Sequence, residues 1–268
     1  MSIPLSLSGK VALISGGSRG IGAATVRMFT AAGAKVAFSF RSARPQAEAL
    51  AKECGVALCH PIAADLNNPE AAGALVAETV RHFGQLDIVV ANHGVWPEQD
   101  VPIDRMSDAQ WRSTLSINVD GVFGLVKHAV ARMKSQIEST TKAQSRKSGP
   151  AGHIVLISST SGQRGEAFHC DYSASKGAII SMTKTLSTEL APDRIYVNCV
   201  APGWVDTDMS ARALADPRSG EEIRREIPMG RAGRPEEIAG PVLFLCTEHA
   251  SFITGEVFNV NGGAVLAG

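Results

Sequence analysis

The chain has 268 residues and carries 26 basic and 26 acidic side chains, so its formal net charge is zero. A protein that binds nucleic acid or an anionic membrane surface needs an excess of lysine and arginine, so we expect neither partner. Hydrophobic residues make up 44% of the chain and no apolar run approaches 18 residues, which indicates a globular protein without a transmembrane helix.

The five cysteines are odd in number and form no C-x-x-C pair, which argues against a disulfide framework and against a zinc ribbon. The first nine residues show no basic cluster ahead of an apolar stretch, so no signal peptide is predicted. We therefore expect a cytoplasmic protein. The seven histidines match no metal-binding motif, and no metal site is predicted.

Short apolar runs alternate with helical patterns along the whole chain. Strands are expected, in chain order, at 11–14, 36–40, 56–62, 87–91, 153–158, 195–200 and 257–260. Helices are expected at 21–32, from 45, from about 69, from about 107, from 118 to about 139, at 172–190 and from 235. Parallel neighbours need crossover connections, so this alternation predicts an α/β fold. We expect one domain, residues 1–268, with a single Rossmann-type doubly wound parallel sheet of about seven strands and helices on both faces.

One polar segment, 135–149, is rich in serine, threonine and lysine and joins a helix to a strand. It is predicted to lie at the N-terminal edge of the sheet, whereas ligands bind outside the C-terminal edge. We interpret it as a solvent-exposed insertion, with docking of a partner as the alternative.

The segment 15–22, SGGSRGIG, falls between the first strand and the first helix, which is where a dinucleotide-binding turn belongs. Glycine allows a tight turn and lets a pyrophosphate approach the backbone amides at the helix N-terminus. The same letters contain G-x-S-x-G centred on Ser18, the pattern of a serine-hydrolase nucleophile elbow. A hydrolase is therefore the remote alternative, although a turn after the first strand leaves little sheet for an oxyanion hole.

The end of the second strand bears on the choice of dinucleotide. An acidic residue there would hold the ribose hydroxyls of NAD, but this chain has Phe40 followed by Arg41, with Arg44 close by and Arg19 in the turn. Guanidinium groups pair with phosphate, so the pattern favours NADP and makes NAD the weaker candidate. The alternative is that these arginines are solvated surface charges.

Tyr172 and Lys176 are four residues apart on an expected helix and so share one face. A phenol with a reference pKa of about 10 is a poor acid or base at neutral pH. A cation about 4 Å away is worth roughly 4 kcal/mol at an effective dielectric near 20, enough to lower the phenol pKa by about 3 units. Burial acts in the opposite direction, so the lysine and an oxidised nicotinamide would have to outweigh it.

The glycine-rich turn, Ala-Asn-His-Gly at 91–94, Asn118, Ser159 and Tyr-Ser-Ala-Ser-Lys at 172–176 together resemble a short-chain dehydrogenase/reductase, over nearly the whole chain. This resemblance implies that Tyr172 is the general acid or base and that Ser159 binds the substrate oxygen. It further implies that Lys176 lowers the tyrosine pKa and holds the nicotinamide ribose, and that Asn118 anchors a water beside Lys176. Two departures are Ser15 in place of threonine and His93 in place of alanine or asparagine, and neither removes a required chemical group.

The resemblance also assigns contacts with the ligands. The cofactor-binding residues would be Ser15, Gly16, Ser18, Arg19, Gly20, Ile21, Gly22, Arg41, Asp65, Leu66, Asn92, Gly94, Tyr172, Lys176, Pro202, Gly203, Val205 and Thr207. The substrate contacts would be Trp96, Ser159, Gln163, His169 and Trp204, under a mobile lid at about 205–228.

The activity implied is hydride transfer between NADP(H) and a carbonyl or secondary alcohol. The nearest members in character are 3-oxoacyl-carrier-protein reductases, with sugar or other alcohol dehydrogenases as the alternative. A cofactor-binding regulator without turnover is a further hypothesis, which the intact tyrosine, lysine and serine make unattractive. Members are usually homotetramers, and the apolar, glycine-rich tail at 252–266 fits burial against another subunit.

Overall fold

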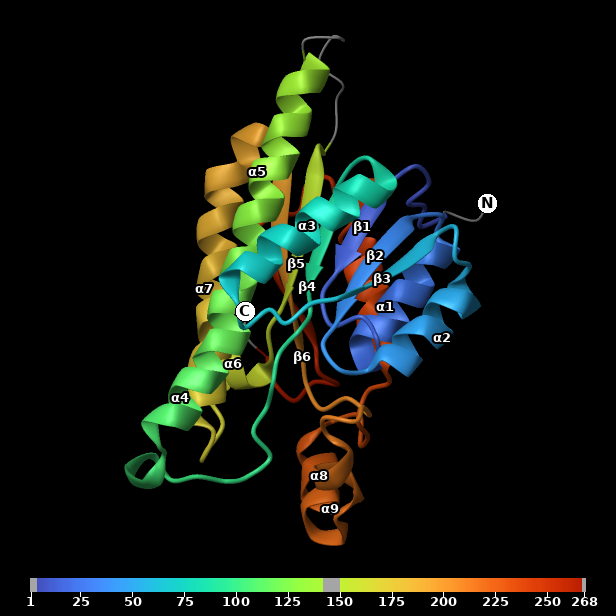
Figure 1. The fold of residues 1–268 in the computed structure, drawn as a ribbon. Coiled ribbons are helices and arrows are strands. Elements are labelled where there is room, and N and C mark those ends of the chain that lie inside the picture. The colour runs from blue at the N-terminus through green and yellow to red at the C-terminus, as the bar shows by residue number, and fades with distance from the viewer. Residues whose placement is uncertain (1–3, 142–149, 267–268) are drawn as a thin grey trace.

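A computed structural model describes residues 4–141 and 150–266 (Figure 1). In these residues, seven parallel strands form one sheet with the order β3-β2-β1-β4-β5-β6-β7. Their bounds are Val11–Ile14 (β1), Lys35–Phe40 (β2), Cys59–Ala63 (β3), Ile88–Ala91 (β4), Gly152–Ile157 (β5), Ile195–Pro202 (β6) and Val257–Val260 (β7). The predicted Rossmann-type parallel sheet is confirmed.

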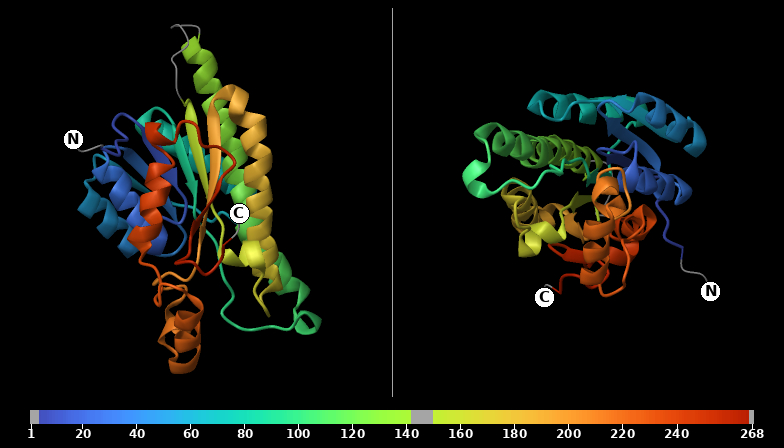
Figure 2. Two further views of the ribbon diagram at one scale, coloured as in Figure 1. Left: turned by 180° about the vertical axis from the view of Figure 1, so that it is seen from behind. Right: turned by 90° about the horizontal axis from the view of Figure 1, so that it is seen from below.

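Helices cover both faces of the sheet, as the two further views in Figure 2 show. Successive residues of a strand point to opposite faces, and β1 follows this rule. Ala12 and Ile14 belong to a hydrophobic cluster that also contains residues of α1 (Gly20–Ala31), α2 (Arg44–Cys54) and α10 (Pro235–Phe244). Leu13 belongs to a second cluster on the other face, with residues of α3 (Pro69–Phe83), α5 (Gly121–Thr141) and α7 (Cys170–Leu190). Because both faces are buried, β1 and β4 are apolar throughout and the other inner strands are mostly so, which made them visible in the sequence.

The register of the sheet brings several strand ends to one edge. β1 pairs with both β2 and β4, so that Ile14 lies beside Phe38 on one side and Val90 on the other. β5 and β6 continue the same edge, with Ile157 beside Val200. The loops that leave these strands therefore meet at the C-terminal edge of the sheet, and α8 (Ala211–Ala215) and α9 (Pro217–Glu226) project from it (Figure 1).

The structure corrects some expected boundaries. β3 begins at Cys59 and not at residue 56, because Gly55 has a φ of 94° and its carbonyl accepts hydrogen bonds from the amides of Leu58 and Cys59. The helix expected from 172 begins two residues earlier, at Cys170. The short helices α6 (Thr160–Arg164), α8 and α9 were not predicted.

The polar segment divides into two parts. Its first part continues α5 as far as Thr141, on the side of the molecule opposite α8 and α9 (Figure 1). The rest of the segment, 142–149, lies outside the described residues. No helix in the described ranges is both long and apolar enough to cross a bilayer.

Candidate active site

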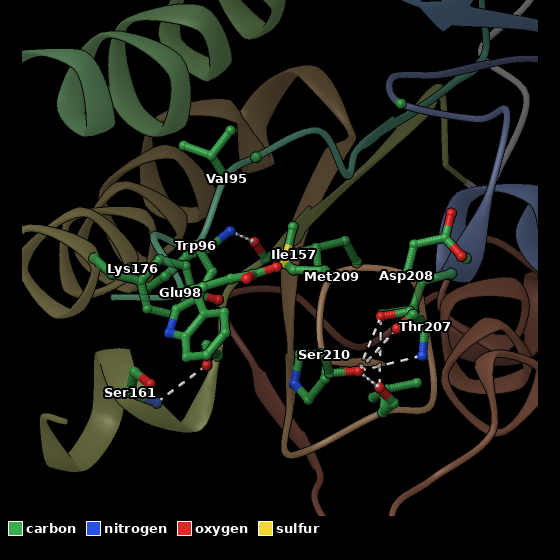
Figure 3. Close-up of a pocket in the computed structure, with 18 of the residues that line it drawn as sticks. Val95, Trp96, Glu98, Ile157, Ser161, Lys176, Thr207, Asp208, Met209 and Ser210 are labelled. Carbon is green, nitrogen blue, oxygen red and sulfur yellow. Dashed lines mark hydrogen bonds between the residues drawn. The ribbon is translucent and has the colours of Figure 1, made fainter. Parts of the chain in front are cut away.

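A cavity of about 1330 Å³ opens at the C-terminal edge of the sheet. Its walls are the glycine-rich turn after β1, the ends of β2, β4, β5 and β6, the start of α7, and the lid that follows β6. Figure 3 shows the two sides of the cavity. Trp96, Lys176 and Ser161 lie on one side, and Thr207 and Asp208 lie on the other.

The glycine-rich turn forms a cradle against the start of α1. Gly16 and Gly20 have φ angles of 64° and 53°, which side chains with a Cβ rarely adopt. A Cβ on Gly22 would lie 2.1 Å from the carbonyl oxygen of Gly16, so the helix can start this close to the strand only with glycine there. No side chain caps the N-terminus of α1, and its first turn carries no acid. Free amides at an uncapped helix N-terminus fit a pyrophosphate.

Hydrogen bonds behind the turn fix its shape. Ser15 is fully buried, and its hydroxyl accepts from the backbone amides of Asn92 at 3.0 Å and His93 at 3.2 Å. The side-chain amide of Asn92 donates to the backbone carbonyls of Ser15 and Gly16, both at 3.1 Å. Ser15 and Gly22 were expected to contact the cofactor but lie outside the cavity wall, so they act as supports of the turn.

His93 lines the cavity and also supports the glycine-rich turn. Its Nδ1 lies 2.7 Å from the Ser15 hydroxyl, and its Nε2 lies against Gly121 at the start of α5. Burial, with the nearby charge of Lys176 as a smaller cause, lowers the pKa of His93 to about 4. The imidazole is therefore neutral at physiological pH.

Three arginines were considered for binding a phosphate, and their surroundings differ. Arg41 and Arg19 line the cavity, and Arg19 also pairs with Asp208 of the lid at 3.5 Å. Arg44 is not part of the wall, because its guanidinium lies over the Phe40 ring at 5.4 Å and pairs with Glu48 at 3.4 Å. In the described residues Arg41 makes no salt bridge, so its charge is not neutralised by the protein.

The expected catalytic side chains converge at the end of β5. Ser159 is the N-cap of α6, and its hydroxyl accepts from the Ser161 amide at 3.1 Å. This bond leaves the hydrogen of the Ser159 hydroxyl free to point toward Tyr172, and the interaction with Ser159 acts to lower the pKa of Tyr172. Lys176 lies one helical turn beyond Tyr172, with its Nζ 5.8 Å from the centre of the phenol ring and 2.9 Å from the Ile157 carbonyl.

Asn118 lies behind this group rather than in the cavity wall. It belongs to a π-helical turn, Ser116–Asp120, where the chain passes from α4 (Asp108–Leu115) to α5. Its side chain accepts from the Val95 amide at 2.8 Å and donates to the Val95 carbonyl at 2.9 Å and to Ser175 at 3.0 Å. Asn118 thus ties the loop after β4 to α7, and a π-turn at such a point is a common feature of functional sites.

The side chains of Lys176 and Asn118 both lie close to Gly94. A Cβ on Gly94 would lie 3.1 Å from the Asn118 Oδ1 and 3.4 Å from the Lys176 Nζ. Glycine at this position therefore leaves the space that the ammonium occupies.

The protonation of the pair differs from the sequence-based expectation. Burial raises the pKa of Tyr172 to about 12, and the hydrogen bond from Ser159 offsets only part of this rise. Burial likewise lowers the pKa of Lys176 to about 8, so about half of it is protonated at pH 8. The expected lowering of the tyrosine pKa by the lysine is thus not seen in the protein alone, because loss of hydration dominates.

The other predicted contacts are mostly brought together. The following predicted residues line the cavity: Gly16, Ser18, Arg19, Gly20, Ile21, Arg41, Asp65, Leu66, Asn92, Gly94, Trp96, Ser159, His169, Tyr172, Lys176, Pro202, Gly203, Trp204, Val205 and Thr207. Gln163 was expected to contact substrate, but it lies outside the wall and its amide donates to Asn259 at 2.6 Å.

The predicted lid carries residues that sequence reasoning missed. In the described part of the chain, ion pairs join it to the rest of the cavity at three places. Asp208 pairs with Arg19 of the glycine-rich turn, Arg212 pairs with Glu98 at 3.4 Å, and Glu226 pairs with Arg164 at 3.7 Å.

Glu98 and Glu166 also line the cavity, and neither belongs to a motif that would have singled it out.

Residues 16–265 match the sequence model of a family described as enoyl-(acyl carrier protein) reductase. The 3-oxoacyl-[acyl-carrier-protein] reductase FabG of Aquifex aeolicus is 37% identical over 262 residues, which are 97% of this chain and 98% of that protein. The chain belongs to the short-chain dehydrogenase/reductase family. An acetoacetyl-CoA reductase of Synechocystis sp. is 38% identical over 97% of this chain and 98% of that protein.

Solved structures of short-chain dehydrogenases/reductases show the same fold. One from Brucella melitensis, described as glucose/ribitol dehydrogenase, has a TM-score of 0.87 and 34% identity over 99% of this chain and 100% of that chain. A 3-ketoacyl-(acyl-carrier-protein) reductase of the same organism, in complex with NADH, has a TM-score of 0.86 and 31% identity over 97% and 100%. The protein is therefore an oxidoreductase that acts on carbonyl or CH–OH groups with NAD(P)(H).

The alternative of a serine hydrolase at Ser18 is set aside. Ser18 does line the cavity, but in the described residues no histidine is hydrogen-bonded to its hydroxyl. His93 also lines the cavity, but its ring contacts the hydroxyl of Ser15. A nucleophilic serine needs a base within hydrogen-bond reach, and Ser18 has none among residues 4–141 and 150–266.

The neutral His93 predicts a specific acid sensitivity. Its pKa of about 4 in the folded protein lies below the ordinary value of 6.5, so the unfolded chain takes up a proton first as the pH falls. The stabilisation is complete above pH 6.5 and is lost as the pH falls toward 4, by up to about 3 kcal/mol. Urea unfolding at pH 7 and pH 4.5 should show a larger loss for the wild-type protein than for His93→Ala.

His153 is also buried, and its pKa is likewise lowered to about 4. It titrates in both proteins, so the difference between them isolates His93. Equal losses of unfolding free energy in the two proteins would show that His93 is not held neutral.

Proposed function

We propose that the protein is an NADP(H)-dependent oxidoreductase that interconverts a carbonyl group and a secondary alcohol. The observation that carries this proposal is the convergence of Ser159, Tyr172 and Lys176 beside a cavity whose far end is an uncapped helix N-terminus. The glycine cradle fits a dinucleotide, which when bound supplies or accepts the hydride at its nicotinamide.

Side chains of the protein bind the substrate oxygen and exchange a proton with it. The Ser159 hydroxyl, already held through Ser161, donates a hydrogen bond to that oxygen and positions it. Tyr172 donates its phenolic proton to the oxygen during reduction and accepts the proton back during oxidation. Lys176 supplies a positive charge beside the phenol, and the Ile157 carbonyl fixes its direction.

Preference for NADP rests on Arg41. This arginine lines the cavity at the end of β2, where an NAD-binding protein has an acid, and it has no salt bridge in the described residues. A guanidinium in that position matches the 2′-phosphate of NADP in charge and in geometry. Arg19 lines the same end of the cavity but shares its charge with Asp208.

We also propose a cytoplasmic homotetramer. The cysteines, Cys54, Cys59, Cys170, Cys199 and Cys246, are all free, which fits a reducing compartment. Large apolar side chains are exposed on α5 and in the C-terminal segment, with Phe123 at 56%, Phe252 at 103% and Leu266 at 90% exposure. Exposed apolar patches of this kind fit burial against further subunits.

The role of Arg41 in cofactor preference can be separated from that of Arg44 by substitution. In Arg41→Ala, kcat/KM with NADPH should fall about ten- to a hundredfold, which corresponds to loss of a charge-assisted hydrogen bond. The value with NADH should change little. Arg44→Ala is the matched control, because Arg44 faces Glu48, and it should leave both values near those of the wild-type protein. A wild-type protein that uses NADH more efficiently than NADPH would contradict the assignment.

The assembly can be tested by light scattering at micromolar concentration. We expect a mass of about four times the chain mass of 28.1 kDa, because the exposed apolar side chains would be covered between subunits. A monomer mass would refute the tetramer and leave the proposed reaction untouched.

A further inference from the structure

The wall of the cavity next to Ser159 carries a carboxylate that the reaction does not use. Glu166 accepts a short hydrogen bond from the Ser161 hydroxyl, and the Ser161 amide in turn donates to Ser159. Glu166 is therefore only two hydrogen bonds away from the group that would hold the substrate carbonyl. Its side chain is 23% exposed, so part of the carboxylate is open to the cavity.

His169 adds a second polar group to the same wall. Its Nδ1 lies 3.2 Å from the Ala167 carbonyl and 3.8 Å from carboxylate oxygens of both Glu166 and Asp100. All these groups are acceptors, so Nδ1 carries a proton and donates toward them.

The other ring nitrogen, Nε2, has no partner in the described residues, and the side chain is only 4% exposed. Leaving a buried polar group unpaired is unfavourable. A hydroxyl group on a bound ligand, which can both donate and accept, would give Nε2 a partner.

Aromatic rings hold the histidine in place. The His169 ring stacks on Trp96 with centroids 5.0 Å apart, and Trp96 meets the edge of Trp204 at 5.6 Å. His169 is also the N-cap residue of α7, three residues before Tyr172. Glu166 and His169 thus lie at fixed positions close to the reacting group, against flat aromatic rings.

The charges at this end of the cavity do not suit an anion. Besides Lys176, which is buried beside Tyr172, Arg164 and Arg212 are the cations of the described wall here, and they pair with Glu226 and Glu98. A carboxylate or phosphate on the substrate would meet the Glu166 carboxylate and arginines that are already paired. Hydroxyl groups, in contrast, can donate to Glu166 and form a hydrogen bond with Nε2 of His169.

We infer that Glu166, His169 and Trp96 form a subsite for a hydroxyl group, so that the preferred substrates are ketones with a hydroxyl close to the carbonyl. This inference rests on the proposed function. Reduction consumes the hydroxy ketone, NADPH and a proton and yields a diol and NADP⁺, with the hydride added to the carbonyl carbon and the proton to its oxygen. A phosphate-bearing acyl thioester is disfavoured by the same wall.

The test compares 3-hydroxy-2-butanone with 2-butanone, two ketones that differ by one hydroxyl, and adds acetoacetyl-CoA as an anionic thioester. All three are assayed with NADPH. A site built to bind a hydroxyl discriminates strongly against the analogue that lacks it. We expect kcat/KM for the hydroxy ketone to exceed that for 2-butanone by more than tenfold, mainly through KM, and acetoacetyl-CoA to be the poorer substrate.

Variants separate recognition by the subsite from the intrinsic reactivity of the hydroxy ketone. His169→Phe keeps a ring against Trp96 but removes Nε2, and Glu166→Gln removes the charge at a partly exposed position. Each should reduce the preference for the hydroxy ketone about tenfold while 2-butanone reduction persists. Glu189→Gln, an exposed position near the far end of α7, is the matched control and should keep the wild-type ratio.

If His169→Phe does not fold, Glu166→Gln decides the question. A preference that persists in the variants, or a preference for acetoacetyl-CoA, would overturn the subsite and leave the oxidoreductase proposal standing. Failure to bind NADPH and to reduce any of the three compounds would overturn the proposed function itself.

Discussion

The loss of hydration around Tyr172 and Lys176 is the constraint on which the site depends. Burial raises the pKa of the Tyr172 phenol to about 12 and lowers the pKa of the Lys176 ammonium to about 8. At neutral pH the lysine is therefore still mostly charged, whereas the phenol alone is a poor proton donor. A positively charged nicotinamide ring beside them would act in a poorly hydrated region, where charge interactions are strong. The protein thus holds an acid and a cation that a bound cofactor can activate.

A rigid frame keeps these two groups in position. The Asn118 side chain joins the loop after β4 to α7, and Ser15 joins the glycine-rich turn to the same loop. The glycine-rich turn and α7 are therefore connected through one loop, and His93 of that loop contacts Ser15. Preorganisation of this kind would let a bound nicotinamide supply the hydride and Tyr172 the proton to one carbonyl group.

The sequence predicted the sheet and most of the cavity wall because both depend on local patterns. Buried parallel strands are apolar throughout, and glycines mark the turn at the start of α1. Contacts between residues that are far apart in the sequence could not be predicted from such patterns. The π-helical turn at Asn118 and the orientation of Gln163 toward Asn259 depend on packing between distant segments. The raised pKa of Tyr172 depends on burial, for which the spacing of Tyr172 and Lys176 gives no measure.

Ultraviolet difference titration of tyrosine ionisation, with and without NADP⁺, tests the central claim most directly. The chain has two tyrosines, so subtracting the spectrum of Tyr172→Phe isolates Tyr172. Without cofactor, a pKa of about 12 leaves only about 1% of Tyr172 ionised at pH 10. Saturating NADP⁺ should move the ionisation of Tyr172 down by at least about one pH unit. An unchanged titration in the presence of bound NADP⁺ would contradict the account.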